Sequence, residues 1–286
     1  MMRQKSLKVL STLLGRIPQE KRSVYLNFLE KSTALELQTE KNPKEKKPDL
    51  SIKELLGIID ESWYLDTLSS YSKKDLIFFL SLFPEEIRQK QAQQFHIEGP
   101  FFSFSKEMEL YFSNLLFKEL FKDQIPLPLS YLSDSPLLFL AGQKSEKLHK
   151  LIFYLGLFDV SAEIKSVLKG SILKSLEKAL FIDEIHFCRE IAEFRHVITF
   201  GQIGLNHWNE DSDSLRQVIF ERGLYRMSLA LSNADPDLLW YLTRCLKKPL
   251  VEKLQKPAKL PIDTGVISVI LEQTQTAWKG VCTVLN

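Results

Sequence analysis

Three similar apolar blocks recur along the chain, each after a polar and often acidic stretch. They begin at Leu76, Leu151 and Leu238 and read LIFFLSLF, LIFYLGLF and LLWYLTRCL. Their starts lie 75 residues apart (76 to 151) and then 87 residues apart (151 to 238), so a repeating unit would hold several helices rather than form a short solenoid repeat. The pattern predicts an all-α fold of stacked multi-helix modules with an armadillo-like architecture, in which the three blocks occupy equivalent places.

Capping residues and prolines predict where several helices begin. Ser51, followed three residues later by Glu54, matches a capping box, so one helix starts directly after Ser51. Pro84 follows the first block and Pro236 follows Asp235, and proline suits the first turn of a helix because its missing N–H is not needed there. Apolar residues at helical spacing predict further helices over residues 7–17, 24–35, 108–120, 164–180 and 265–278.

Residues 194–208 do not follow the helical pattern. Val197, Ile198 and Thr199 are β-branched, and Gly201 and Gly204 bracket a turn. A short β-hairpin is therefore an open alternative in this segment.

Proline and charge divide the chain into an arm, a linker and three modules. Residues 39–49, TEKNPKEKKPD, contain two prolines and alternating charge without an apolar side chain, so their own burial cannot offset the entropy of ordering them. Residues 1–38 form a basic helical arm that buries little by itself, and we expect it to dock on the body of the chain or on a partner helix. The breaks downstream predict modules over residues 50–123, 124–200 and 201–286.

The charge of the chain is nearly balanced. Lysine and arginine number 38 against 36 acids, a net +2, which creates no global field for a nucleic-acid backbone. Residues 1–50 hold 11 basic and 6 acidic side chains, and the remainder holds 27 and 30. A basic start thus precedes a slightly acidic body, and we expect no nucleic-acid partner.

Cysteines and apolar segments predict a cytoplasmic protein. Cys188, Cys245 and Cys282 lie far apart, a sparse and odd count typical of a reducing compartment. The apolar stretch over residues 7–14 is interrupted by Lys8 and lacks a small-residue cleavage site, so we expect no signal peptide. No window approaches the roughly 18 consecutive apolar residues that a spanning helix needs. We expect no membrane insertion, and a position at the inner face of a membrane would come only through a protein complex.

No familiar catalytic, cofactor or metal motif occurs in the sequence. The GQIG at Gly201 lacks the further glycine and the lysine of phosphate-binding loops. We therefore expect no enzyme, no cofactor and no metal. An enzyme with an unfamiliar site is an alternative, and it would need acids such as Asp183 and Glu184 to converge in a deep pocket. Four acid pairs lie where a helix start or turn is expected, so capping explains them: Asp60–Glu61, Glu85–Glu86, Asp183–Glu184 and Glu210–Asp211. The histidines form no ligand pattern: His96, His149, His186, His196 and His207.

Aromatic side chains supply the candidate interface. In the apolar blocks their neighbours are aliphatic rather than arginine-rich, which favours core packing over base stacking. Phe101, Phe102 and Phe104 follow the break at Gly99–Pro100, where large apolar groups more readily reach a hinge or an interface. These three phenylalanines are the predicted interaction residues.

Residues 51–100 carry an ordered series of features that point to a family. The series is an acidic turn at Asp60–Glu61, leucines at Leu65 and Leu68, Asp75–Leu76 opening an apolar helix, then Glu85–Glu86–Ile87–Arg88 and a closing Glu98–Gly99–Pro100. It resembles the armadillo-like unit of flagellar motor switch proteins of the FliG type, and SDSPLLFL and NADPDLLWYL echo it later. The resemblance implies a stacked-helix adaptor at the cytoplasmic base of a flagellum or of the related type III secretion apparatus.

Departures from the family pattern favour a static part over a rotating one. The family's Ala-Leu-Lys-Gly stretch is replaced by bulky aromatics, its Glu-His-Pro-Gln signature is absent, and Ser69, Ser70 and Tyr71 stand where basic torque-generating side chains are expected. Phe101 to Phe104 approximates the family's Met-Phe-x-Phe hinge. We expect a non-enzymatic scaffold whose partners are protein subunits of a membrane ring or sorting platform. A secreted, host-directed helical binding protein is the alternative.

Overall fold

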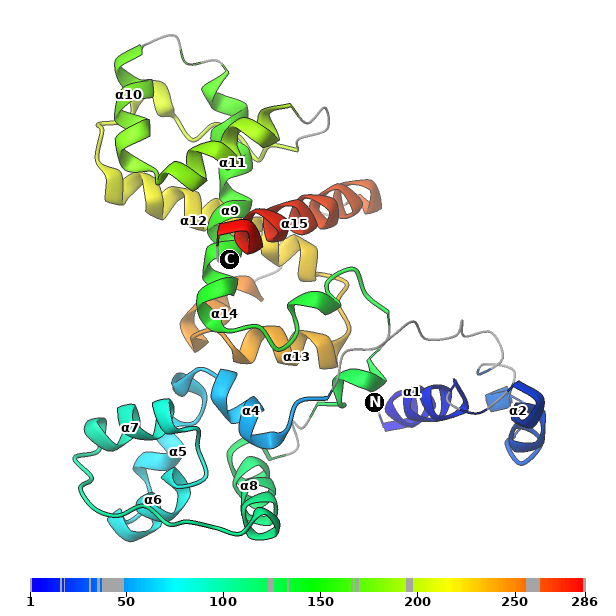
Figure 1. The fold of residues 1–286 in the computed structure, drawn as a ribbon. Helices are drawn as coiled ribbons and strands as arrows, with labels where there is room; N and C mark the ends of the chain where they lie inside the picture. The colour runs from blue at the N-terminus through cyan, green and yellow to red at the C-terminus, as the bar shows by residue number, and fades with distance from the viewer. Residues whose placement is uncertain are drawn as a thin grey trace. The chain divides into compact units, whose positions relative to one another are not determined.

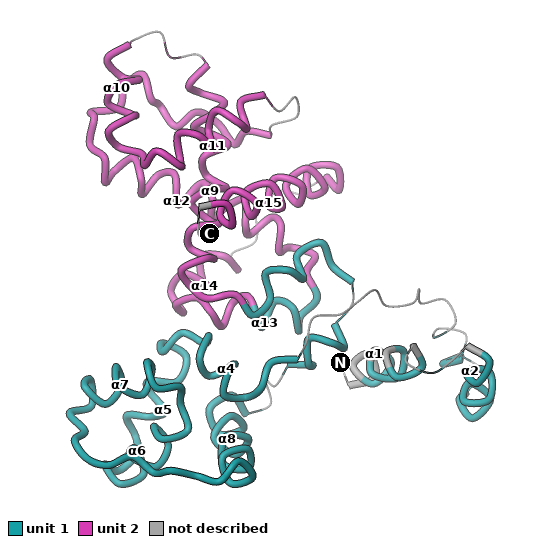
Figure 2. Tube along the Cα trace, viewed as in Figure 1, with its two compact units in different colours: residues 1–142, 235–241 teal, residues 143–234, 242–286 magenta. Residues whose placement is uncertain are grey.

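The computed structural model describes most of the chain, which divides into two compact units (Figures 1 and 2). Unit 1 is Met1–Gly142 with Asp235–Tyr241, and unit 2 is Gln143–Ala234 with Leu242–Asn286. All regular structure in the described ranges is helical, without a strand, which confirms the all-α prediction. The described residues are 2–15, 17, 19–30, 32–34, 37, 49–122, 126–132, 134–165, 167, 170–193, 198–255 and 263–284.

Unit 1 joins the arm to a group of short helices. The predicted capping box is confirmed, because the Glu54 amide donates to Ser51 Oγ and the Ser51 amide donates to Glu54 Oε2 at 2.7 Å. The helix that begins there packs against the long helix α8. The helices of unit 1 are α1 (Met2–Gly15), α2 (Gln19–Leu26), α4 (Ile52–Ile58), η1 (Glu61–Trp63), α5 (Leu65–Ser69), α6 (Lys73–Leu80), α7 (Glu85–Gln94), α8 (Lys106–Phe121), η2 (Leu129–Tyr131) and η3 (Leu138–Leu140), followed by the start of α13 (Pro236–Arg244).

The arm and the linker are only partly described. Helix α1 contacts η2, so the arm lies against the body of its own unit. Helix α2 ends at Leu26, before the end of the predicted stripe over residues 24–35. Residues 39–48 of the predicted linker lie outside the described residues. Asp49, its last residue, is held in place because both carboxylate oxygens accept hydrogen bonds from Ser130, at 2.7 and 2.9 Å.

Unit 2 is built around one central helix, α9. Its residues 151–161 are all buried, and α11, α12 and α15 pack around it. Two glycines permit the closest of these contacts: a Cβ added at Gly156 would lie 1.9 Å from the carbonyl oxygen of Ile219, and one at Gly223 would lie 1.6 Å from that of Ile152. The helices are α9 (Ser145–Ile164), α10 (Gly170–Ala179), α11 (Ile182–Ala192), η4 (Leu205–His207), α12 (Ser212–Leu231), α14 (Lys248–Leu254) and α15 (Thr264–Val284).

The three apolar blocks do not occupy equivalent places. The first begins in the short helix α6 and continues past its end at Leu80; Phe78 and Phe79 are half-buried and residues 80–83 are buried. Every residue of the second is buried inside α9. The third lies in α13, whose first residues belong to unit 1 and whose last belong to unit 2. The prediction that the three blocks occupy equivalent places in stacked modules is therefore not confirmed, because the first lies at a short helix, the second within the central helix of unit 2, and the third across the division between the units.

Two further boundaries differ from the predictions. The break predicted between residues 200 and 201 does not separate compact units, because α9 and α12 pack tightly together. The stripe predicted as one helix over residues 164–180 is divided, since α9 ends at Ile164 and α10 begins at Gly170. The helix predicted over residues 265–278 is confirmed and extends over the whole of α15.

Buried charges hold residues 198–205 against α9 and α12. The Glu163 carboxylate accepts from the amides of Ile203, Gly204 and Leu205, the last at 2.7 Å. Arg226 Nη2 donates to the Ile198 carbonyl at 2.6 Å. These bonds replace strand pairing, so the hairpin alternative is wrong for residues 198–204, which contain no strand; residues 194–197 lie outside the described residues.

Among the described helices, none is both long enough and apolar enough to cross a bilayer.

Candidate functional site

An aromatic cluster lies on unit 1, where α6, α8 and the segment before α8 meet. Phe78 of α6 is at its centre, with ring centroids 5.8 Å from Phe102, 5.3 Å from Phe104 and 4.9 Å from Phe112. We call the cluster and the apolar side chains beside it on α8 the aromatic surface. It consists of Tyr71, Phe78, Phe79, Phe102, Phe104, Met108, Tyr111, Phe112 and Leu115.

Several side chains of the aromatic surface face solvent. Phe102 is 53% exposed and Tyr111 is 62% exposed. Met108, Tyr111 and Leu115 are spaced three and four residues apart, so they form one stripe of α8. A neighbouring stripe of α8 is buried and includes Leu116 and Leu120. These apolar side chains are thus gathered in one place rather than scattered singly, which makes them a candidate interaction surface.

The segment before α8 is fixed to α6 by a hydrogen bond. The Phe102 amide donates to Ser81 Oγ at 2.9 Å, and Ser81 Oγ in turn donates to the Ile77 carbonyl at 2.6 Å. Ser105 caps α8 by accepting from the Met108 amide. The backbone that carries Phe102 and the start of α8 is therefore held by hydrogen bonds.

The predicted interface residues separate in the structure. Phe102 and Phe104 stack with centroids 6.1 Å apart in the aromatic surface. Phe101 does not join them, and its ring lies 5.1 Å from the guanidinium carbon of Arg88. The contribution of Tyr111 was missed, because the apolar stripe over residues 108–120 predicts burial. The available signal was that α8 carries more apolar positions than one buried face can hold.

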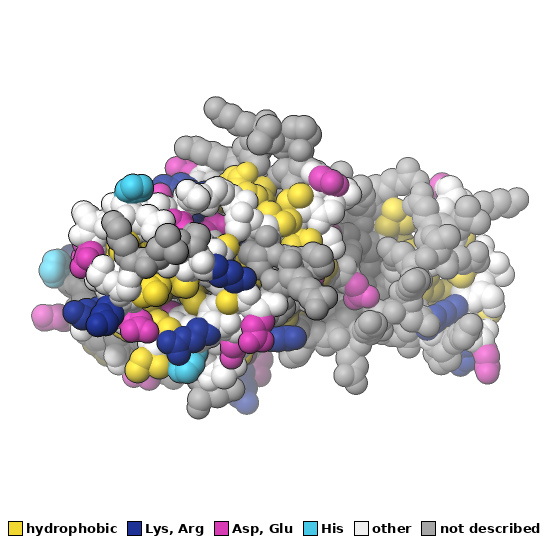
Figure 3. Space-filling model, turned by 90° about the horizontal axis from the view of Figure 1, so that it is seen from above, with side chains coloured by type: hydrophobic (Ala, Val, Ile, Leu, Met, Phe, Trp, Pro, Cys, Tyr) yellow, Lys and Arg dark blue, Asp and Glu magenta, His cyan; other side chains and the backbone are white. Residues whose placement is uncertain are grey.

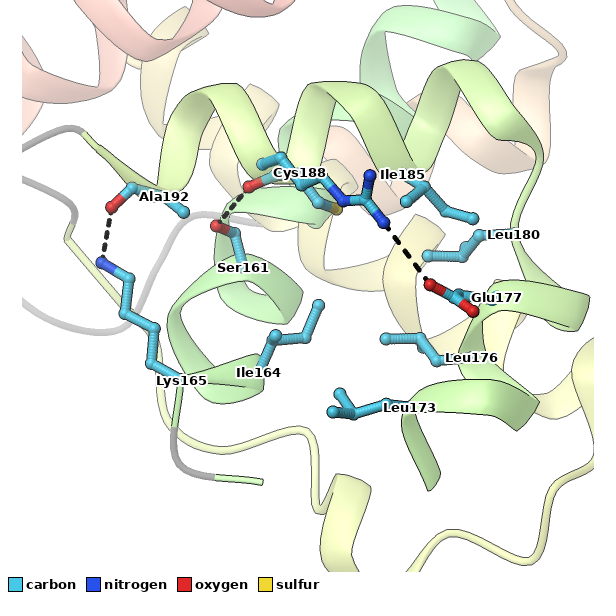
Figure 4. Close-up of a pocket in the computed structure, with 11 residues that line it drawn as sticks. Ser161, Ile164, Lys165, Leu173, Leu176, Glu177, Leu180, Ile185, Cys188 and Ala192 are labelled. Atoms are coloured by element: carbon cyan, nitrogen blue, oxygen red, sulfur yellow. Dashed lines mark hydrogen bonds and ion pairs between the residues drawn. The ribbon is translucent and has the colours of Figure 1, made fainter. Parts of the chain in front are cut away.

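Unit 2 contains a pocket of about 260 Å³ between α9, α10 and α11 (Figure 4). Its polar groups are already paired: Ser161 Oγ donates to the Cys188 carbonyl at 2.8 Å, and Lys165 Nζ donates to the Ala192 carbonyl at 2.6 Å. Burial, with a smaller contribution from Glu184, raises the pKa of the Cys188 thiol to about 12, so the thiol is neutral. Glu177 and Arg189, which also line the pocket, pair with each other at 3.4 Å, so the free part of the lining suits an apolar group. Its apolar wall includes Ile164, Leu173, Leu176, Leu180 and Ile185.

Asp183 and Glu184 do not converge on this pocket. Glu184 Oε2 accepts from the Phe181 amide at 2.9 Å, and the two Glu184 oxygens bind Arg216 at 2.8 and 2.9 Å. Asp183 Oδ2 accepts from Tyr154 at 2.8 Å and from Lys150 at 3.1 Å. Burial raises the pKa of Asp183, but these two hydrogen bonds, the charge of Lys150 and a backbone hydrogen bond together hold the pKa below its ordinary value. Both acids thus serve as capping and ion-pair groups.

The other acidic groups have similar roles. Asp60 accepts from the Ser62 amide at the start of η1, and Asp211 caps α12. Within the described ranges, no three side chains of histidine, cysteine, aspartate or glutamate lie where they could hold a metal ion together. The face drawn in Figure 3 shows acidic, basic and apolar side chains intermixed, without a large cluster of either charge.

Comparisons with protein-family models, with curated proteins and with solved structures find no match to this chain. The resemblance of residues 51–100 to the FliG-type unit therefore depends on the motifs named above alone.

Proposed function

We propose that the protein is a non-enzymatic scaffold that binds other protein subunits through its aromatic surface. The observation that carries this proposal is the exposure of Phe102 and Tyr111 within a cluster of contacting rings. Removal of apolar area from water favours association, and only the part of this gain that exceeds the lost translational, rotational and side-chain freedom appears as affinity. Aromatic side chains are enriched among residues that dominate binding energy.

The contacts that hold the exposed rings in place favour binding. Ring contacts and the hydrogen bond between Phe102 and Ser81 restrict the side chains before a partner arrives. A preorganised surface loses less conformational entropy on association than a mobile one. Lys53 Nζ of α4 also lies 2.5 Å from Glu109 Oε1 of α8, which ties α8 to the body of unit 1.

The class of assembly comes from the resemblance over residues 51–100. Its acidic positions lie at helix starts, with Asp60 capping η1, Asp75 in the first turn of α6, and Glu85 and Glu86 in the first turn of α7. This agreement supports an adaptor at the cytoplasmic base of a type III secretion or flagellar assembly. In that setting the protein would reach the inner face of the membrane through its partners.

Site-specific crosslinking in cells tests the proposal. A photo-crosslinking amino acid replaces Leu115 on the aromatic surface, and the matched control replaces Phe181, which is exposed on unit 2. We expect position 115, but not position 181, to crosslink to a membrane-ring or sorting-platform protein in cells that retain the apparatus. Failure to capture any such protein at position 115 would count against the proposed function.

A further inference from the structure

The pocket of unit 2 is lined along the length of two helices. One wall extends from Leu173 to Leu180 and another from Ile185 to Ala192, and seven residue steps (173 to 180, 185 to 192) correspond to about 10 Å of helical rise. The volume is about 260 Å³, whereas an apolar cavity of roughly 150 Å³ holds a benzene molecule. The pocket therefore has room for one hydrocarbon chain of about eight carbon atoms.

The buried lining accepts only the apolar part of a ligand. Ser161 and Cys188 are both buried, the Ser161 hydroxyl donates to the Cys188 carbonyl, and burial keeps the Cys188 thiol neutral. A polar ligand atom placed beside them would lose its hydrogen bonds to water without replacing them. The group that enters the pocket is therefore hydrocarbon.

The exposed rim of the pocket carries one cation more than it carries acids. Its ionisable side chains are Lys165, Glu177 and Arg189, and the last two pair with each other between α10 and α11 (Figure 4). Within the described residues, Lys165 has no ion pair with a carboxylate. Its ammonium group has three N–H donors and uses one of them on the Ala192 carbonyl. Lys165 is thus able to donate to an anionic group at the mouth of the pocket.

We propose that this pocket binds a medium-chain alkyl carboxylate, with the chain against Leu173, Leu176 and Ile185 and the carboxylate beside Lys165. The source is a free fatty acid, because the volume encloses a single short chain and phospholipids carry two longer ones. The site lies entirely within unit 2, so it is independent of the aromatic surface.

Titration calorimetry of the full chain with octanoate tests the site. We expect one octanoate to bind per chain and 1-octanol, which lacks the charge, to bind more weakly. Leu173→Trp fills the pocket from a half-buried position and should weaken octanoate binding tenfold or more. Ala192→Leu fills it from α11 and should act in the same direction. Lys165→Glu should weaken binding only about fivefold, because exposed ion pairs contribute little.

Lys178→Glu is the matched control for charge. It makes the same charge change at an exposed position of α10 outside the pocket lining, so octanoate should bind as it does to the unmodified chain. Melting temperatures identify the variants that remain folded. Absence of octanoate binding, equal binding of 1-octanol, or unchanged binding by both filling variants would each overturn the proposal. Sedimentation of the chain with phosphatidylglycerol vesicles, abolished by Leu173→Trp, would also overturn it in favour of a bilayer lipid.

Discussion

Asp159 of α9 and Arg226 of α12 form an ion pair from which water is excluded. Asp159 Oδ1 lies 2.5 Å from Arg226 Nη2, and both side chains are 0% exposed. Arg226 also donates to Gln273 Oε1 of α15 and to the Ile198 carbonyl. A single guanidinium therefore connects three helices with the irregular segment that begins at residue 198.

Replacing one member of this pair should be far more damaging than replacing both. We expect Asp159→Ala to lower the free energy of unfolding by about 3–5 kcal/mol, because it leaves an uncompensated buried charge. Asp159→Leu combined with Arg226→Met should be closer to the unmodified chain than either change alone. Urea denaturation measures all four variants, and a loss below about 1 kcal/mol for Asp159→Ala would show that the guanidinium finds another partner.

The glycine contact between α9 and α12 should tolerate no side chain. Gly156→Ala places a methyl group against the Ile219 carbonyl, so the helices must separate, and we expect a loss of about 3 kcal/mol or more. Gly170→Ala is the control, because nothing lies within 4 Å of a Cβ added there. Thermal unfolding should show a large decrease for the first variant and no decrease for the second. Equal melting temperatures would mean that the helices are not in backbone contact.

Acid should remove the contribution of Asp183 to stability. Its pKa is lower in the folded chain than its ordinary value, so its contribution is fully present above the unfolded-state pKa of about 3.9 and is lost as pH falls through the folded-state pKa. The difference in unfolding free energy between the unmodified chain and Asp183→Asn should stay constant near neutral pH and shrink below about pH 4. Tyr154→Phe, which removes one hydrogen bond to Asp183, should reduce the pH-dependent part. A difference that does not change with pH would contradict this role.

Cys188 should react slowly while the chain is folded. Its thiol is buried and its pKa is raised to about 12, so little thiolate exists near neutral pH. Cys282 is partly exposed and should be alkylated faster. Mass spectrometry of iodoacetamide-treated protein compares the two sites, with unfolded protein as the control in which both react. Alkylation of Cys188 at the rate of Cys282 would indicate that the wall of the pocket opens readily.

Helix starts were predictable because caps depend on neighbours only a few residues away. Ser51 with Glu54 and Asp235 before Pro236 act as expected, since the Asp237 amide donates to Asp235 Oδ1. Part of the candidate interface was also predictable from local sequence, because Phe102 and Phe104 follow the break at Gly99–Pro100. Tyr111 was not predictable: a stripe of α8 is apolar whether or not another helix covers it.

The sequence by itself determined that helices form at LIFFLSLF and LIFYLGLF, because apolar spacing and nearby caps act within a few turns. The first of these helices ends at Leu80, inside its block. Only the tertiary structure decided that the second became the centre of unit 2 and that residues 77–79 of the first remained half-buried. The sixth positions differ: Gly156 allows the α12 backbone to touch α9, whereas Ser81 at the corresponding place receives the Phe102 amide at the end of α6. Gly156 permits this close contact only because Gly223 of α12 leaves space for the α9 backbone in return. Gly223 is remote in sequence from both blocks, so the blocks themselves do not determine how deeply each is buried.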